Sequence, residues 1–156
     1  MKDIHYTNNV ITHTSYPVEY FIAKPNPGVQ HAYIGLEISH NIIRYTGYGF
    51  GDQRPDKSAA AGIKGWNTYN AAEDYVMNNN IFDRSKYMLM QVGAGATAWM
   101  PKMDGNTYII EEGANFGNIG ANSSFATPML ASYIKANSKD ENASVYILKK
   151  GEVPIG

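Results

Sequence analysis

The strict alternation of apolar and polar residues over residues 31–38 constrains the fold of this chain most strongly. A period of two belongs to a strand with one buried face and one solvated face. The apolar face consists of Ala32, Ile34, Leu36 and Ile38. The other face begins with His31, passes through Tyr33, and ends with Glu37. We therefore expect a sheet with one face open to water, which is typical of antiparallel sheets.

Further strands are expected where short apolar runs are bounded by turn residues. They are predicted over residues 16–24, 42–48, 86–92, 107–111 and 144–149. The polar residues 39–41 predict a hairpin that joins the strands on either side of them. Helical patterns occur over residues 56–64, 67–77 and 124–136. No internal repeat and no linker is apparent, so residues 1–156 are expected to form one α+β domain with a largely antiparallel sheet packed against helices.

Charge and composition argue against several classes of partner. The formal net charge of −1 lacks the basic excess that a nucleic-acid-binding surface normally carries. No segment reaches the roughly 20 apolar residues that span a bilayer, so we expect a soluble chain and not an integral membrane protein. Residues 1–9 do not resemble a signal peptide, which leaves a cytoplasmic location or export by a signal-independent secretion system.

The stretch most suggestive of chemistry is residues 120–127, GANSSFAT, which predicts a turn that leads into a helix. Free backbone N–H groups and the dipole at a helix start stabilise an anionic nucleophile there. Ser123 or Ser124 can cap the helix, and the other hydroxyl is then free to react. A serine needs a base within hydrogen-bond reach, and His31 on its strand is the best candidate. The alternative interpretation is that the serines serve as caps only.

Two patches resemble circularly permuted papain-like proteins, the bacterial relatives of NlpC-type amidases and of lecithin retinol acyltransferase. The first patch is residues 28–36, GVQHAYIGL, followed by residues 44–50, RYTGYGF. The second is Asn122-Ser123 followed closely by Phe125. The resemblance implies a permuted papain-like fold in which His31 is the base and Ser123 occupies the nucleophile position. The usual nucleophile of the family is cysteine, which this chain lacks.

The remaining members of the predicted site are less sharply defined. The residue that would orient the imidazole is either Glu37, on the same strand face as His31, or His40 in the following turn. Tyr48 lies in a loop rich in glycine and aromatic residues, of the kind that lines a pocket. The residues predicted to bind the ligand are Tyr33, Tyr48, Asn122 and Ser124.

The resemblance implies a hydrolase or acyltransferase that acts on an amide or ester bond in a peptide, glycopeptide or lipid, such as a peptidoglycan peptide. An amidase of this kind could serve as a bacterial effector toxin with a cognate immunity protein. The alternative is a non-catalytic binding module, or an immunity or adaptor protein, on the same fold. No cofactor is predicted, and the spacing of His5 and His13 matches no known metal-ligand pattern. The chain's twelve tyrosines, with Trp66 and Trp99, could line a groove for a sugar or peptide chain.

Overall fold

A computed structural model gives the architecture, and all statements below concern the residues that it describes. These are residues 2–20, 27–28, 33–65, 72–93, 100–114, 117–119, 140 and 142–152. Their strands form three sheets, and every pair of neighbouring strands is parallel. The first sheet contains β1 (Lys2–Thr7), β4 (Tyr33–Ser39), β7 (Ala72–Glu73), β8 (Val76–Asn78) and β11 (Lys102–Asp104). The second contains β2 (Val10–Thr12), β5 (Ile42–Thr46), β9 (Ile81–Ser85), β12 (Thr107–Glu111) and β14 (Ser144–Leu148). The third contains β3 (Val18–Tyr20), β6 (Ala61–Gly65), β10 (Met88–Val92) and β13 (Gly117–Ile119).

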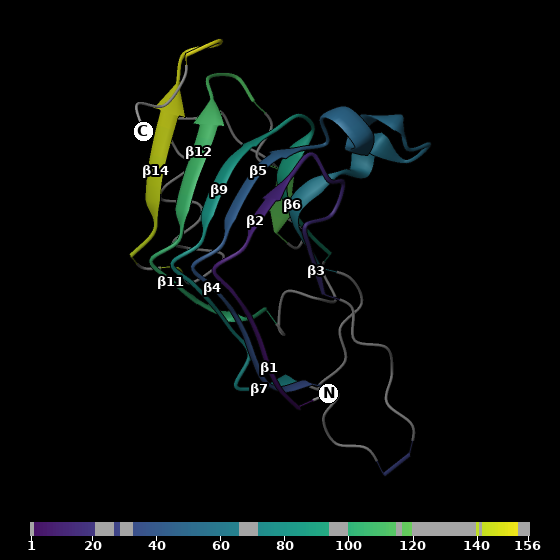
Figure 1. Ribbon diagram of the computed structural model, residues 1–156, viewed down its shortest axis with the longest axis vertical. Helices are drawn as coiled ribbons and strands as arrows, with labels where there is room; N and C mark the ends of the chain where they lie inside the picture. The colour runs from purple at the N-terminus through teal and green to yellow at the C-terminus, as the bar shows by residue number, and fades with distance from the viewer. Residues whose placement is uncertain are drawn as a thin grey trace.

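The chain visits the three sheets in the same order again and again, so it winds into a parallel β-helix. The strands of the second sheet lie side by side from β2 to β14, in the order of the sequence (Figure 1). Successive coils differ in length, because equivalent positions are separated by 32, 39 and 26 residues. The extra residues leave the helix as loops, and one of them contains the 3₁₀ segments η1 (Gly49–Gln53) and η2 (Lys57–Ala59).

The predicted α+β fold, with an antiparallel sheet packed against helices in a permuted papain-like arrangement, is wrong. The turn at residues 39–41 does not form a hairpin: β4 pairs with β1 and β8, whereas β5 pairs with β2 and β9 in another sheet. The helix predicted over residues 56–64 is wrong as well, since only η2 is helical there and the buried strand β6 follows it. In the helix predicted over residues 67–77, the described part contains strand β7 and the start of strand β8 and no helical turn. The predicted helix 124–136 lies outside the described residues.

The inside of the β-helix is an apolar core in which equivalent residues of successive coils stack on one another. Ile43, Phe82 and Tyr108 occupy one such position, and each is 2% exposed or less. The rings of Phe82 and Tyr108 are stacked with nearly parallel planes, and their centroids are 5.5 Å apart. Such stacking buries large apolar areas and is the main stabilising contribution of each coil.

A column of amide side chains, here called the asparagine ladder, runs through the turns that precede the second sheet. It consists of Asn9, Asn41, Asn80 and Asn106, and it ends at Asp140. The Oδ1 atom of Asn80 accepts hydrogen bonds from the backbone N–H and from the Nδ2 of Asn41, at 3.1 and 3.0 Å. Asn80 repeats this arrangement toward Asn106, with both bonds at 2.9 Å. A buried amide is costly without partners, so the continuous ladder satisfies polar groups that the turn would otherwise bury.

The residue before each ladder asparagine has a left-handed backbone conformation. The φ angles are 59° at Asn8, 58° at His40 and 55° at Asn79, and glycine takes this position at Gly105. Asparagine and glycine adopt this conformation at the lowest cost, which explains why they recur in the turn. His40 therefore serves as a turn residue, with its side chain exposed.

Replacing Asn80 with alanine should destabilise the protein far more than the same change at Asn9. Asn80 is fully buried and its side chain makes bonds to both neighbouring coils, whereas Asn9 is only partly buried in the first coil. We expect Asn80→Ala to lower the free energy of unfolding by about 3–5 kcal/mol, because it leaves several buried polar groups without a hydrogen-bond partner. Asn9→Ala should cost about 1 kcal/mol. Denaturant unfolding of both variants checks this, and equal losses would contradict the ladder's role.

Candidate functional site

The predicted catalytic residues are not brought together by anything that the structure describes. His31, Asn122, Ser123 and Ser124 lie outside the described residues, so the hydrolase mechanism stays a prediction. Tyr33 begins strand β4, and its side chain is also outside the description. The described partner of Glu37 is His5 on the neighbouring strand, with Nδ1 and Oε2 2.8 Å apart. This hydrogen bond is the main reason why the pKa of Glu37 is lowered.

Among the predicted site residues that the structure describes, Tyr48 lines a pocket. The cavity has a volume of about 210 Å³ and lies where the strands of the second sheet end. It is lined by residues from several successive coils: Tyr48, Arg84, Ser85, Lys86, Leu89, Ile110, Glu111, Glu112, Gly113, Ala114 and Lys150. Because each coil contributes only a few residues, the pocket exists only when the coils are stacked.

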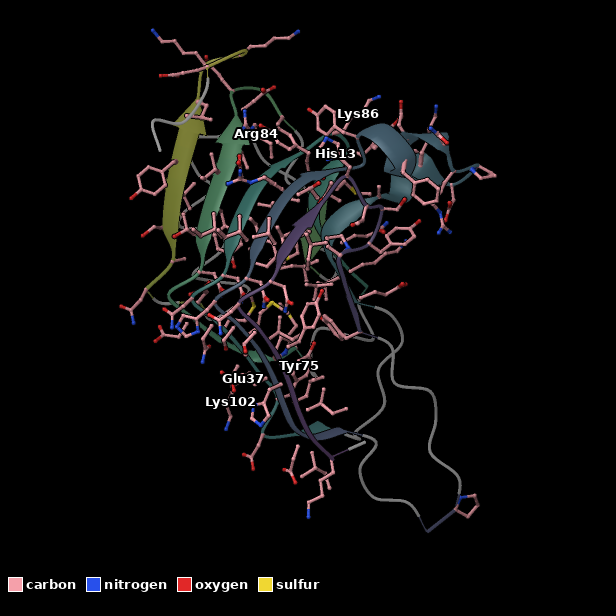
Figure 2. All side chains as sticks on the ribbon, viewed as in Figure 1. His13, Glu37, Tyr75, Arg84, Lys86 and Lys102 are labelled. Carbon is pink, nitrogen blue, oxygen red and sulfur yellow. The ribbon has the colours of Figure 1, made fainter. Side chains whose placement is uncertain are left out.

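A row of stacked side chains leads to the pocket along the same edge of the β-helix. His13, Tyr45 and Arg84 follow one another in successive coils, and all three have φ angles between 54° and 57°. The His13 ring stacks on Tyr45 at 5.3 Å, and the Arg84 guanidinium lies 4.7 Å from the Tyr45 ring centroid. Figure 2 shows His13, Arg84 and Lys86 at the same end of the sheet.

The stacked row stops at the pocket because the next coil has a different conformation there. Ile109 pairs with Asp83, so Ile110 takes the position beside Arg84. Ile110 is only 4% exposed and belongs to the apolar core. No outward side chain therefore continues the row, and the pocket lies at this position with Ile110 and Leu89 among its lining residues.

Arg84 is held rigidly at the pocket by a buried carboxylate. Its Nε and Nη2 donate to Asp83 at 2.7 and 3.1 Å, and Nη2 also donates to the Tyr45 hydroxyl at 2.9 Å. The hydrogen bond to Asp83 is the main reason why the pKa of Arg84 is raised. Nη1 makes no hydrogen bond within the described part of the chain, which leaves its two N–H donors available on a fixed guanidinium.

Asp52 of η1 fixes the loop that carries Tyr48. It accepts hydrogen bonds from the Tyr87 hydroxyl at 2.6 Å and from Lys86 Nζ at 2.7 Å, and Lys57 Nζ lies 3.7 Å away. The Lys86 bond is the largest of the effects that lower the pKa of Asp52 to about 2. These contacts tie the loop to the turn that follows β9, and so they position one wall of the pocket.

Three charged side chains at the pocket are left without a partner of their own. Glu111, Glu112 and Lys150 have no side-chain hydrogen bond or ion pair among the described residues, although all three line the cavity. Burial is the main reason why the pKa of Tyr48 is raised, and the charge of Glu111 adds to this effect. The same charge makes a smaller contribution to the raised pKa of Arg84. The pocket thus offers carboxylate acceptors and cationic donors that do not satisfy one another.

The described lining of the pocket combines charged side chains with hydroxyl groups and apolar surface. Ser85 supplies an aliphatic hydroxyl, and its Oγ donates to the Thr46 carbonyl at 3.5 Å. None of the described lining residues is a histidine that could act as its base. Within the described ranges, no group of three or more His, Asp or Glu side chains is placed to hold a metal ion.

Sequence analysis missed Arg84, Glu111, Glu112 and Lys150 as pocket residues. Neighbouring residues on a strand point to opposite faces, so the adjacent Glu111 and Glu112 do not predict a shared site. The structure places both at one cavity, since Glu111 ends β12 and Glu112 already belongs to the turn. No local signal marks these residues, because they meet only through the winding of the chain.

Comparisons with known proteins leave the fold and the pocket as the basis for any functional conclusion. No protein-family model matches this chain, and no curated protein or solved structure matches it. The described residues also contain no helix that is long and apolar enough to cross a membrane.

Replacing Lys86 with methionine should bring the pKa of Asp52 back toward its ordinary value of 3.8. Because the folded state lowers this pKa, the contribution of Asp52 to stability is present above the unfolded-state pKa and is lost as the pH falls toward about 2. The loss of stability on acidification should therefore be smaller in Lys86→Met. An NMR titration of the Asp52 carboxyl carbon measures the shift. The matched control is Lys102→Met, on the first sheet, which should leave the pKa of Asp52 unchanged. An unchanged titration midpoint of Asp52 in Lys86→Met would contradict the role assigned to the Lys86 hydrogen bond.

Proposed function

We propose that this chain is a carbohydrate-binding module and that the pocket between Tyr48 and Lys150 holds one sugar unit. The observation that carries the proposal is the presence of unpaired donors and unpaired acceptors in one small cavity. Glu111 and Glu112 supply the acceptors, and Lys150 and Arg84 Nη1 supply the donors. A sugar hydroxyl both donates and accepts hydrogen bonds, so an array of hydroxyls can satisfy both kinds of group.

The size and the lining of the pocket support the same class of ligand. A volume of about 210 Å³ is below the range of about 300–1,000 Å³ that is usual for drug-sized ligands. It suits a single ring rather than a nucleotide cofactor. Leu89 and Ile110 supply apolar surface for the carbon-bound face of a ring, and Tyr48 supplies an aromatic ring with a polar end.

The surroundings of the pocket leave room for the rest of a saccharide chain. The stacked row of His13, Tyr45 and Arg84 approaches it from one side, with one side chain from each of three successive coils. Phe50 in η1 is 71% exposed on the loop that Asp52 anchors. Such aromatic surfaces give apolar contact together with polar edges. The proposal therefore places one sugar unit in the pocket and its neighbours along this edge.

Truncation of the unpaired pocket charges should weaken the binding of sugar without unfolding the protein. An array of neutral and acidic oligosaccharides identifies a bound sugar, and titration calorimetry with that sugar gives the affinity. Lys150→Ala and Glu112→Gln should each weaken binding about tenfold, the loss expected for one charge-assisted hydrogen bond. Both residues are exposed, and thermal unfolding should be almost unchanged.

The matched control is Lys102→Ala, an exposed lysine on β11 that lies well away from Arg84 in Figure 2. It should leave the affinity unchanged. Binding of amino acids or peptides, with no oligosaccharide bound at millimolar concentration, would contradict the proposal. An equal loss of affinity in Lys102→Ala would show that the pocket is not the site.

A further inference from the structure

The asparagine ladder has a direction, because each amide group bonds to the coil before it and to the coil after it. In the interior of the ladder, Nδ2 donates forward to the Oδ1 of the next asparagine and backward to a carbonyl oxygen of the preceding coil. The backward bonds run from Asn41 to Tyr6 O at 2.8 Å, from Asn80 to Ile38 O at 2.9 Å, and from Asn106 to Met77 O at 2.9 Å.

Asn9 has the forward half of this arrangement and lacks the backward half. Its N–H and its Nδ2 both donate to Asn41 Oδ1 at 3.0 Å, as in the interior of the ladder. Its second amide hydrogen goes to Thr7 O of its own coil at 3.0 Å. Its Oδ1 accepts no hydrogen bond from any described residue. The corresponding oxygen of Asn41, Asn80 or Asn106 accepts two.

The opposite end of the ladder is closed by side chains that cannot continue it. Ser144 N donates to Asn106 O, as Thr107 N does to Asn80 O, so Ala143 stands at the ladder position of the next coil. The side chain of alanine has no amide group. Asp140 instead accepts hydrogen bonds from Asn106 Nδ2 at 2.9 Å and from the Tyr108 hydroxyl at 3.0 Å. The ladder is terminated at this end and open at Asn9.

The strands around Asn9 are also at the free edge of the structure. β1, β2 and β3 are the terminal strands of the three sheets in the strand order, so each has one edge without a described neighbour. Val10, directly after Asn9, is 66% exposed. Parallel edges with free N–H and C=O groups accept further strands, and β-helices are stabilised by the stacking of neighbouring coils.

We propose that the face formed by β1, β2 and β3 is a docking surface for one further coil of parallel β-helix. The occupant is a polypeptide segment that adds a parallel strand to each sheet. At its turn, a backbone N–H and an asparagine-type amide donate to Asn9 Oδ1. Its carbonyl oxygen would take over the second amide hydrogen of Asn9 from Thr7. This inference does not depend on the proposed sugar site.

The experiment appends a second copy of residues 1–32 directly before Met1, which repeats the 32-residue offset between the first two coils. Hydrogen exchange measured by NMR should then slow at least tenfold at amides of β1 and β2 that do not bond to β4 or β5. Asn9→Ala should also become as destabilising in the extended chain as Asn80→Ala, because Asn9 is then an interior member of the ladder.

Two further chains complete the comparison. A 32-residue glycine–serine extension should leave both the exchange rates and the cost of Asn9→Ala unchanged. An appended coil in which leucine replaces the copy of Asn9 should raise the cost of Asn9→Ala by less than the asparagine coil does, because only its backbone N–H and carbonyl can bond to Asn9. Identical exchange with the appended coil and with the linker would overturn the proposal. A dimer of the original chain in which the β1 amides are already protected would also overturn it, since the occupant would then be a second copy.

Discussion

The hydrogen bonds that converge on the ladder oxygens are the interactions on which the rest of this structure depends. The coils have unequal lengths, so a regular spacing of residues cannot set how one coil lies on the next. The ladder does so at one point in each coil from Asn9 to Asn106, because Oδ1 of each following asparagine accepts both the N–H and the Nδ2 of its predecessor. A column of buried amides is stabilising only when each member is satisfied, so a shift of one coil would leave polar groups unpaired on both sides.

The pocket depends on the same alignment, although it lies at another corner of the β-helix. Asn80 begins the coil that continues through Phe82, Asp83 and Arg84. Phe82 is in the core, and Asp83 lies beneath the guanidinium of Arg84. A slip of one residue would turn Asp83 inward and Phe82 outward, since side chains alternate along a strand. The ladder excludes this slip, and it thereby holds Arg84 in place beside Glu111.

Local patterns predicted many of the strands but not how they pair. The predicted strands 107–111 and 144–149 match β12 and β14 closely, because alternation is a local property. Alternation is the same in parallel and antiparallel strands, so the turn at residues 39–41 could be read as a hairpin. The repeat is present in the sequence as NNVI, HNII, NNIF and GNTY, each with a ladder asparagine second. Because the spacing of these four motifs is unequal, a search for a repeat of fixed length does not detect them. Tyr48 was predicted from its glycine-rich loop, whereas Arg84 and Glu111 meet only through the winding of the chain.

The asparagine ladder and the pocket lie at different corners of the β-helix, and this separation explains how such a protein can vary its surface without losing its fold. The ladder corner is short, repeats an asparagine after a left-handed residue, and tolerates little change because its groups are buried. The loops that leave the helix elsewhere differ in length from coil to coil, and Asp52 helps to anchor the η1 loop through its side-chain contacts with Tyr87 and Lys86. Adding residues to a loop costs little in closure entropy, since this cost grows only slowly with length. Insertions there can therefore build a pocket, while the ladder preserves the register that brings its walls together.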